Sequence, residues 1–232
     1  MKKKLVNCIL LLFVAYNASA QCRYCRTYED FKEDKWEMLD TVYCKTHTKG
    51  HKFLWGGSDF SITTGDKATD KMLKKDAFAV KQGKKLFVNC RNLAYQKGLF
   101  GMGYAQAMTM GKDTLFFIST KVGKNIQEQQ IMAGVAFGAI GGGIAGGTQA
   151  MNQACYLINT ETYNRGPKNN VTMINDDEMK KLLGVTSDLY GEYISEHDPA
   201  KRLKPEHIYP ILKKAGLFKK IKQSKNTPEE QE

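Results

Sequence analysis

The chain has 232 residues, a formal net charge of +11 at pH 7 and 42% hydrophobic residues. This length is enough for one sizeable domain, and the basic balance favours anionic partners in general. The lysines are spread along the chain and do not alternate with aromatic residues, so the composition argues against a nucleic-acid-binding protein.

Residues 1–20 have the order of a secretory signal peptide. Three lysines precede an apolar run over residues 5–14, which is too short for a permanent membrane anchor. The small residues Ala18 and Ala20 fit a signal peptidase, so we expect cleavage before Gln21. The protein is therefore expected to be exported to the periplasm, the outer envelope or the exterior. Its formal charge falls from +11 to +8 when the three lysines are removed.

Short elements follow the expected cleavage site. Residues 27–35 predict a brief helix, because Thr27 is a good cap and acidic residues occupy the first turn. We expect a strand over residues 36–43, a polar loop over 45–57, a strand over 60–64 and a helix over 67–75.

Three hairpins are predicted in the middle of the chain. Each pairs two short apolar runs that turn residues separate: 77–81 with 86–90, 104–110 with 114–120, and 154–159 with 171–174. Phe116, Phe117 and Ile118 are consecutive, which is typical of a strand that is covered on both faces.

A glycine zipper lies at residues 131–147, where glycine recurs every four residues at Gly134, Gly138, Gly142 and Gly146. On a helix this spacing forms a flat stripe for close packing. No charged residue occurs from 129 to 160, so a membrane segment has to be considered. The seven glycines in this run and the polar residues after it favour a buried or groove-lining helix in a soluble domain over membrane insertion or a membrane-seeking hairpin.

The C-terminal part is predicted to be helical. Asn175 or Asp176 caps a helix that ends at Leu183, and further helices are expected over 187–196 and 205–214. The sequence therefore predicts an α+β fold with mainly antiparallel hairpins, a glycine-rich helix and a C-terminal helical segment. We expect one domain over 21–218, β-rich over 36–175 and helical over 176–218, followed by a disordered tail at 219–232.

Five cysteines remain after cleavage. The spacing of Cys22, Cys25, Cys44 and His47 matches a Cys3His zinc site. A disulfide among Cys22, Cys25 and Cys44, joining Cys44 to Cys25 or Cys22, is favoured over zinc, because an exported protein meets an oxidising environment and Cys22 would be close to a frayed terminus. Cys25 with Cys44 is the preferred pair. Lipid on Cys22 is disfavoured, because Gln21 is not the small residue that lipoprotein processing prefers.

Catalytic patterns are incomplete. The CxxC motif of Cys22 and Cys25 lacks the βαβ context of a thiol oxidoreductase. A cysteine nucleophile would need Cys90 or Cys155 beside His197 or His207, yet both cysteines lie in apolar runs typical of buried thiols. His47 and His51 are expected to be surface histidines.

Four segments carry a resemblance to known proteins: Tyr28–Phe31, Phe87–Leu93 (FVNCRNL), Phe100–Tyr104 (FGMGY) and Phe137–Gly142 (FGAIGG). Their order resembles a group of exported Bacteroidetes proteins of uncharacterised function. The resemblance implies an extracytoplasmic α+β domain and supplies no catalytic residues. The sequence thus favours an exported protein with a binding or structural role, without a cofactor, whose partner is an anionic envelope surface or another envelope protein. The alternatives are a cysteine-dependent enzyme and a protein that associates with membranes through the zipper.

Overall fold

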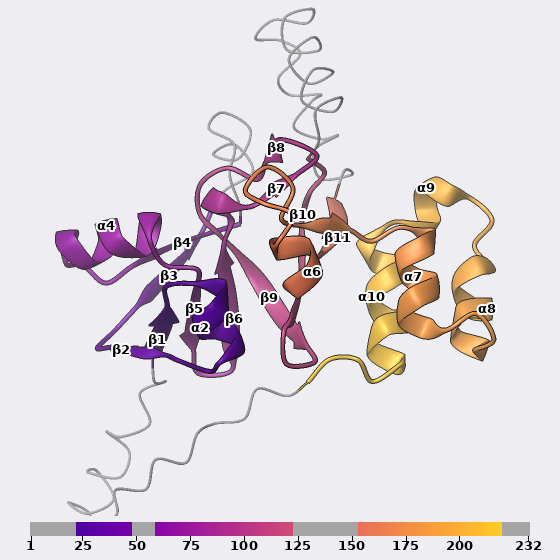
Figure 1. Cartoon of the computed structure of the whole chain (residues 1–232), viewed down its shortest axis with the longest axis horizontal. Helices are drawn as coiled ribbons and strands as arrows, with labels where there is room; N and C mark the ends of the chain where they lie inside the picture. The colour runs from indigo at the N-terminus through magenta and orange to yellow at the C-terminus, as the bar shows by residue number, and fades with distance from the viewer. Residues whose placement is uncertain (1–21, 48–58, 123–152, 220–232) are drawn as a thin grey trace, which may run out of the picture.

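The computed structural model describes residues 22–47, 59–122 and 153–219 (Figure 1). Helices and antiparallel strands are mixed in these residues, which confirms the predicted α+β class. The strands are β1 (Cys22–Cys25), β2 (Glu37–Leu39), β3 (Tyr43–Thr46), β4 (Phe60–Thr63), β5 (Ala79–Gln82), β6 (Lys85–Asn89), β7 (Ala94–Tyr95), β8 (Gly98–Leu99), β9 (Tyr104–Met110), β10 (Thr114–Thr120), β11 (Gln153–Ile158) and β12 (Thr172–Met173). The helices are α2 (Tyr28–Lys32), α4 (Lys67–Lys75), α6 (Thr160–Tyr163), α7 (Asp176–Leu183), α8 (Asp188–Ile194), α9 (Pro199–Arg202) and α10 (Pro205–Lys214).

Three predicted features lie outside the described residues. They are the signal segment 1–20, the glycine zipper at Gly134, Gly138, Gly142 and Gly146, and residues 220–232 of the predicted tail. Within the described ranges, no helix is both long and apolar enough to cross a membrane.

One large antiparallel sheet organises the fold, with the strand order β12-β11-β10-β9-β6-β5-β1-β2. β4 joins this sheet beside β9, and β3 pairs with β4. The hairpins predicted at 77–90 and 104–120 are confirmed as β5–β6 and β9–β10. The third predicted pair is confirmed as β11–β12, but its connection contains α6.

The first face of the sheet carries the central core, in which Leu115 and Phe117 of β10 meet the aromatic side chains of α2 and α6. The rings of Tyr28 and Tyr163 stack with centroids 4.5 Å apart. The Tyr28 hydroxyl also donates to the carbonyl of Asp113, at 2.5 Å, so α2 is tied to the β9–β10 turn. This core therefore holds α2 and α6 against the middle of the sheet.

The second face carries two separate clusters, because alternate residues of each strand point to opposite faces. Near α4, Val80 and Phe87 pack with Leu73. At the β10–β11 end, Phe116 and Leu157 pack beneath α7, α8 and α10 (Figure 1). Phe116 and Phe117 are both fully buried, in clusters on opposite faces, which confirms that β10 is covered on both sides.

The helix starts follow the predicted capping residues. Thr27 and Asp30 form a capping box at α2, and Asn175 accepts a hydrogen bond from the backbone N–H of Glu178 at α7. The predicted helix over 27–35 ends earlier than expected, at Lys32, because Asp34 adopts a positive φ of 56°.

The strand predicted over residues 36–43 is divided into two. β2 pairs with β1, whereas β3 pairs with β4, so the chain changes sheet partner between Leu39 and Tyr43. β3 also extends to Thr46, into the start of the predicted polar loop, most of which lies outside the described residues.

Candidate functional site

An open cleft lies where α9 and the first turn of α10 meet the start of β11, with a volume of about 490 Å³. Its lining brings together residues from three separate parts of the chain, and these are Gln153, Glu196, Lys201, Lys204, Pro205, Glu206 and His207. Side chains of both charges thus line one open cleft.

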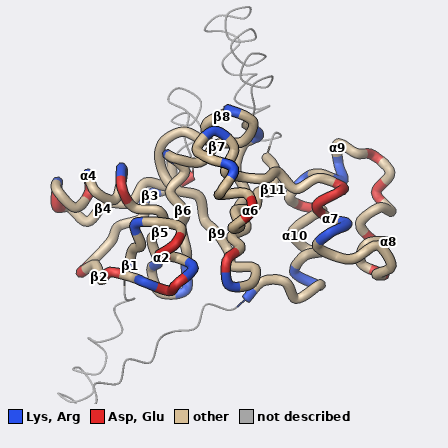
Figure 2. The backbone as a smooth tube through the Cα atoms, viewed as in Figure 1, with Lys and Arg blue, Asp and Glu red and all other residues tan. Residues whose placement is uncertain are grey.

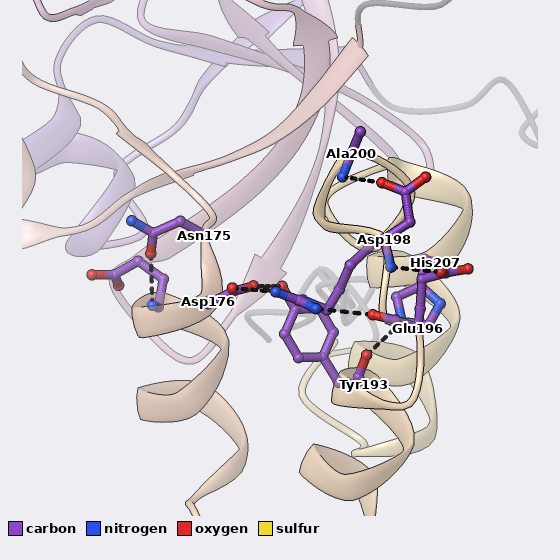
Figure 3. A network of polar contacts seen from close by, with 9 residues as sticks. Asn175, Asp176, Tyr193, Glu196, Asp198, Ala200 and His207 are labelled. Carbon is purple, nitrogen blue, oxygen red and sulfur yellow. Dashed lines mark hydrogen bonds and ion pairs between the residues drawn. The ribbon is translucent and has the colours of Figure 1, made fainter.

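Two prolines set the helix starts at the cleft. Pro199 and Pro205 occupy the first turns of α9 and α10, where a missing backbone N–H breaks no helical hydrogen bond. Asp198 caps α9 by accepting from the backbone N–H of Ala200 at 2.9 Å (Figure 3). Lys204 is the N-cap of α10 but makes no capping hydrogen bond through its side chain. The Lys204 ammonium is therefore left to line the cleft.

A partly buried polar network supports the residues at the cleft (Figure 3). Arg202 donates to both carboxylate oxygens of Asp176, and its Nη1 donates to the carbonyl of Glu196 at 2.9 Å. The Tyr193 hydroxyl also donates to Asp176, at 2.6 Å. The network connects α7, α8 and α9, so the backbone at Glu196 is fixed although it lies in a connection.

The network also shifts the pKa values of Asp176 and Tyr193 in opposite directions. The Arg202 guanidinium holds the pKa of Asp176 below its usual value, with a further contribution from the Tyr193 hydroxyl, although partial burial opposes the shift. Burial, followed by the hydrogen bond to Asp176, raises the pKa of Tyr193. Asp176 is thus the charged acceptor and Tyr193 the neutral donor of this contact.

His207 is held by the same helices. Its Nε2 lies 2.9 Å from the carbonyl oxygen of Tyr193. A carbonyl oxygen only accepts, so Nε2 is the donor and carries a hydrogen. The remaining ring nitrogen, Nδ1, is the one left for another contact.

The charges at the cleft are only partly satisfied by one another. Glu196 accepts from the backbone N–H of Asp198 at 3.0 Å, and the Lys201 ammonium is 3.9 Å from the Asp198 carboxylate. The side chains of Lys204 and Glu206 form no hydrogen bond or ion pair with any part of the chain that the structure describes. Both acidic and basic residues occur along α7–α10 (Figure 2), so the cleft lies in a surface of mixed charge.

The predicted Cys25–Cys44 disulfide is not found, and no disulfide joins the cysteines of the described ranges. Cys25 is buried in the central core on the first face of the sheet. Cys44 packs on the second face, against the cluster near α4, which also contains Cys22. The sheet therefore separates the two side chains of the preferred pair.

The sheet also separates the side chains that were considered as zinc ligands. The sequence places Cys22, Cys25, Cys44 and His47 at suitable spacing, but Cys25 points to the opposite face from Cys22 and Cys44. Among residues 22–47, 59–122 and 153–219, no group of three or more His, Cys, Asp or Glu side chains is placed to hold a metal ion.

The cysteines considered as nucleophiles are inaccessible. Cys90 and Cys155 are fully buried. Burial raises the pKa of the Cys155 thiol, and Glu206 raises it further. Because the thiolate is the nucleophile, a buried thiol with a raised pKa does not serve this role. His207, the candidate base, already donates its Nε2–H to Tyr193.

Most of the cleft was missed from the sequence. Of its lining residues, only His207 is a candidate in the sequence, and the charged residues Glu196, Lys201, Lys204 and Glu206 have the pattern of a solvated surface. The signal that could have identified them is the pair Pro199 and Pro205, which predicts two helix starts within seven residues and hence a sharp corner.

A family model described as "Family of unknown function (DUF6563)" matches residues 23–219. No curated protein and no solved structure matches the chain. The family match extends from β1 to just beyond α10 and includes every residue that lines the cleft. It confirms that the relatives are uncharacterised, whereas export and the bacterial source implied by the resemblance stay predictions.

Proposed function

We propose that this chain, which belongs to the family of unknown function DUF6563, is an exported binding protein of the cell envelope rather than an enzyme. The observation that carries the proposal is the cleft beside α9 and α10. Its lining offers two lysines, two glutamates, a glutamine and a histidine, and it contains no serine, threonine or cysteine that could act as a nucleophile. Such a lining is suited to recognising charged groups.

Export is supported by where the folded region begins, which is directly after the expected signal peptide. The expected cleavage site precedes Gln21, β1 begins at Cys22, and the family match begins at residue 23. Removal of residues 1–20 would therefore leave the matched region complete.

The charges favour one of the two partners expected from the sequence. An anionic surface would be attracted by Lys201 and Lys204 but repelled by Glu196 and Glu206 in the same cleft. A protein segment with both acidic and basic groups can satisfy both pairs. We therefore infer that the partner is another envelope protein that presents such a segment.

Site-specific photocrosslinking in living cells tests this function. A benzophenone amino acid at Lys201 of the full chain should give a discrete protein adduct. The adduct should be lost when Lys204→Glu and Glu206→Lys are introduced singly, because each reversal places like charges opposite the partner. The same amino acid at Lys35, on an exposed position after α2, is the control and should not give this adduct.

Two outcomes would contradict the proposal. Identical adducts at Lys201 and Lys35 would show that the cleft is not selective, and turnover of a substrate by the purified chain would favour an enzyme. Export is tested separately by N-terminal sequencing of the protein from the envelope fraction, which should begin at Gln21.

A further inference from the structure

Arg23 and Lys81 interrupt an otherwise apolar row of side chains on the first face of the sheet. The row crosses six strands through directly paired residues, which are Met38, Arg23, Lys81, Leu86, Ala107 and Phe117. The last three belong to the central core. The two cations therefore lie between this core and Met38, which is 60% exposed on the edge strand β2.

Both cations are on the first face because side chains alternate between the two faces along a strand. Cys22 and Tyr24, on either side of Arg23, pack on the second face, as does Val80, which precedes Lys81. Arg23 and Lys81 are each half-buried and lie directly opposite one another in the β1–β5 pair. Like charges in this position repel, so the pair is unfavourable unless an anion offsets it.

The surroundings of Lys81 leave its hydrogen-bond donors available. The ammonium lies 5.3 Å from the centroid of the Trp36 ring, and it makes no hydrogen bond or ion pair within the described residues. Burial lowers the pKa of Lys81, Asp34 opposes this shift, and Arg23 adds to it. The exposed Asp34 carboxylate accepts from the Trp36 indole N–H at 2.6 Å, so its hydrogen bond goes to the ring and not to the ammonium.

We propose that Arg23 and Lys81 bind the phosphate group of a phosphate monoester. The guanidinium presents paired N–H donors that match phosphate oxygens, and the ammonium adds a compact positive charge. A phosphate monoester carries a charge of about −1.5 to −2 at pH 7, enough to offset both cations. The Cβ atoms of directly opposed residues lie about 4.5–5.5 Å apart, so one phosphate group can contact both side chains.

Met38 and Trp36 are placed to contact the organic part of such a ligand. Met38 is the exposed neighbour of Arg23, and the half-buried Trp36 ring lies beside Lys81. This site is at the β1–β2 end of the sheet, whereas the cleft is at the β11 end (Figure 1). The inference therefore goes beyond the proposed binding function and does not depend on it.

Calorimetric titration of the full chain with phenyl phosphate tests the site. The wild type should bind one equivalent, and Arg23→Ala and Lys81→Met should each weaken binding about tenfold or more, because each removes a hydrogen bond to a charged group. Lys85→Ala is the matched control. It removes the same charge from β6, but Lys85 is next to Leu86 and so lies on the second face, and the affinity should be retained. Equal affinity of the wild type and both site variants would overturn the proposal.

Acetylation of Lys81 measures the same contact without a substitution, so it does not depend on how a variant folds. Only the neutral amine reacts, and a bound phosphate favours the ammonium form by raising the pKa of Lys81. Phenyl phosphate should therefore slow the acetylation of Lys81 several-fold at pH 8 and leave that of Lys85 unchanged. Mass spectrometry of the digested protein gives the rate at each lysine, and an unchanged rate at Lys81 would contradict the proposal.

Two further probes identify the source of the phosphate group. Phenyl phosphate should bind more tightly than inorganic phosphate, and Met38→Ser should reduce this preference. Vesicles of phosphatidylcholine with phosphatidic acid present the same group on a lipid. Cosedimentation that Lys81→Met abolishes would assign a lipid headgroup, whereas binding of phenyl phosphate without cosedimentation would assign a soluble monoester. Vesicle binding that survives Lys81→Met, with no binding of phenyl phosphate, would overturn the site.

Discussion

Arg202 donates from Nε and Nη2 to the two carboxylate oxygens of Asp176, at 3.0 and 2.6 Å, across 26 residues of sequence. The Arg202 side chain is 15% exposed and that of Asp176 is 47% exposed, so this two-point contact is partly shielded from water. It joins the start of α7 to the end of α9 and thereby fixes one wall of the cleft. The pair is a structural support for the cleft and does not line it.

Arg202→Ala should lower the free energy of unfolding by about 1–3 kcal/mol, because the Asp176 carboxylate and the Glu196 carbonyl lose charge-assisted hydrogen bonds. Urea denaturation measures this change. Arg165→Ala is the control: its partner Glu161 is 80% exposed, and the loss should be about 0.5 kcal/mol or less. Equal losses in the two variants would mean that the Arg202 contact is no stronger than a surface pair.

The same contact predicts a pH dependence. Arg202 holds the folded pKa of Asp176 below the unfolded value of about 3.9. A depressed carboxyl pKa contributes stability that is complete above the unfolded pKa and is lost as pH falls through the folded pKa. Asp176→Asn, which cannot titrate, should therefore be less stable than the wild type at pH 7, and the gap should shrink below about pH 4. Urea midpoints at pH 7, 5, 4 and 3 test this, and a constant gap would contradict it.

The sequence predicted the strands and helices correctly where their positions depend on residues nearby in the chain. The β5–β6 and β9–β10 hairpins depend on short turns, and the helix starts at Thr27 and Asn175 depend on caps only a few residues away. The break between β2 and β3 was missed, because it depends on which distant strands, β1 and β4, accept each half.

The cleft and the cysteine arrangement could not be derived in the same way. The spacing in the sequence predicted that Cys25 and Cys44 lie in one site. Side chains alternate between the two faces along β1, however, so Cys25 lies on the face opposite Cys22. Similarly, Gln153 and Lys204 line one cleft only because α10 packs on β11, and these two elements are far apart in sequence.

The buried thiols predict resistance to alkylation. In the reduced native protein, Cys25, Cys90 and Cys155 should remain unlabelled by iodoacetamide, because all three are buried and burial raises the pKa of Cys25 to about 12. They should react fully in urea. Mass spectrometry of the labelled peptides gives the result for each residue. Rapid native labelling of Cys90 or Cys155, with loss of a measurable turnover, would revive the cysteine-enzyme alternative.

The β7–β8 turn contains two residues in a conformation that favours glycine. Gln96 and Lys97 have φ values of 49° and 68°, as a two-residue turn between paired strands requires, although neither is glycine. The turn is held in place by the backbone N–H of Lys97, which donates to the carbonyl of Lys168 at 2.8 Å, and by that of Gln96, which donates to the Asn169 side chain at 3.0 Å. The surrounding contacts therefore maintain a local strain.

Lys97→Gly should raise the free energy of unfolding by up to about 1 kcal/mol, because glycine adopts this φ without the Cβ clash and retains the N–H that bonds Lys168. Lys112→Gly is the matched control in the β9–β10 turn. Lys112 has no positive φ, so glycine there only increases the entropy of the unfolded chain and should destabilise the protein by roughly 0.5–1 kcal/mol. Urea denaturation of the two variants should thus give shifts of opposite sign. Destabilisation by Lys97→Gly would show that the lysine side chain contributes more at this turn than its backbone conformation costs.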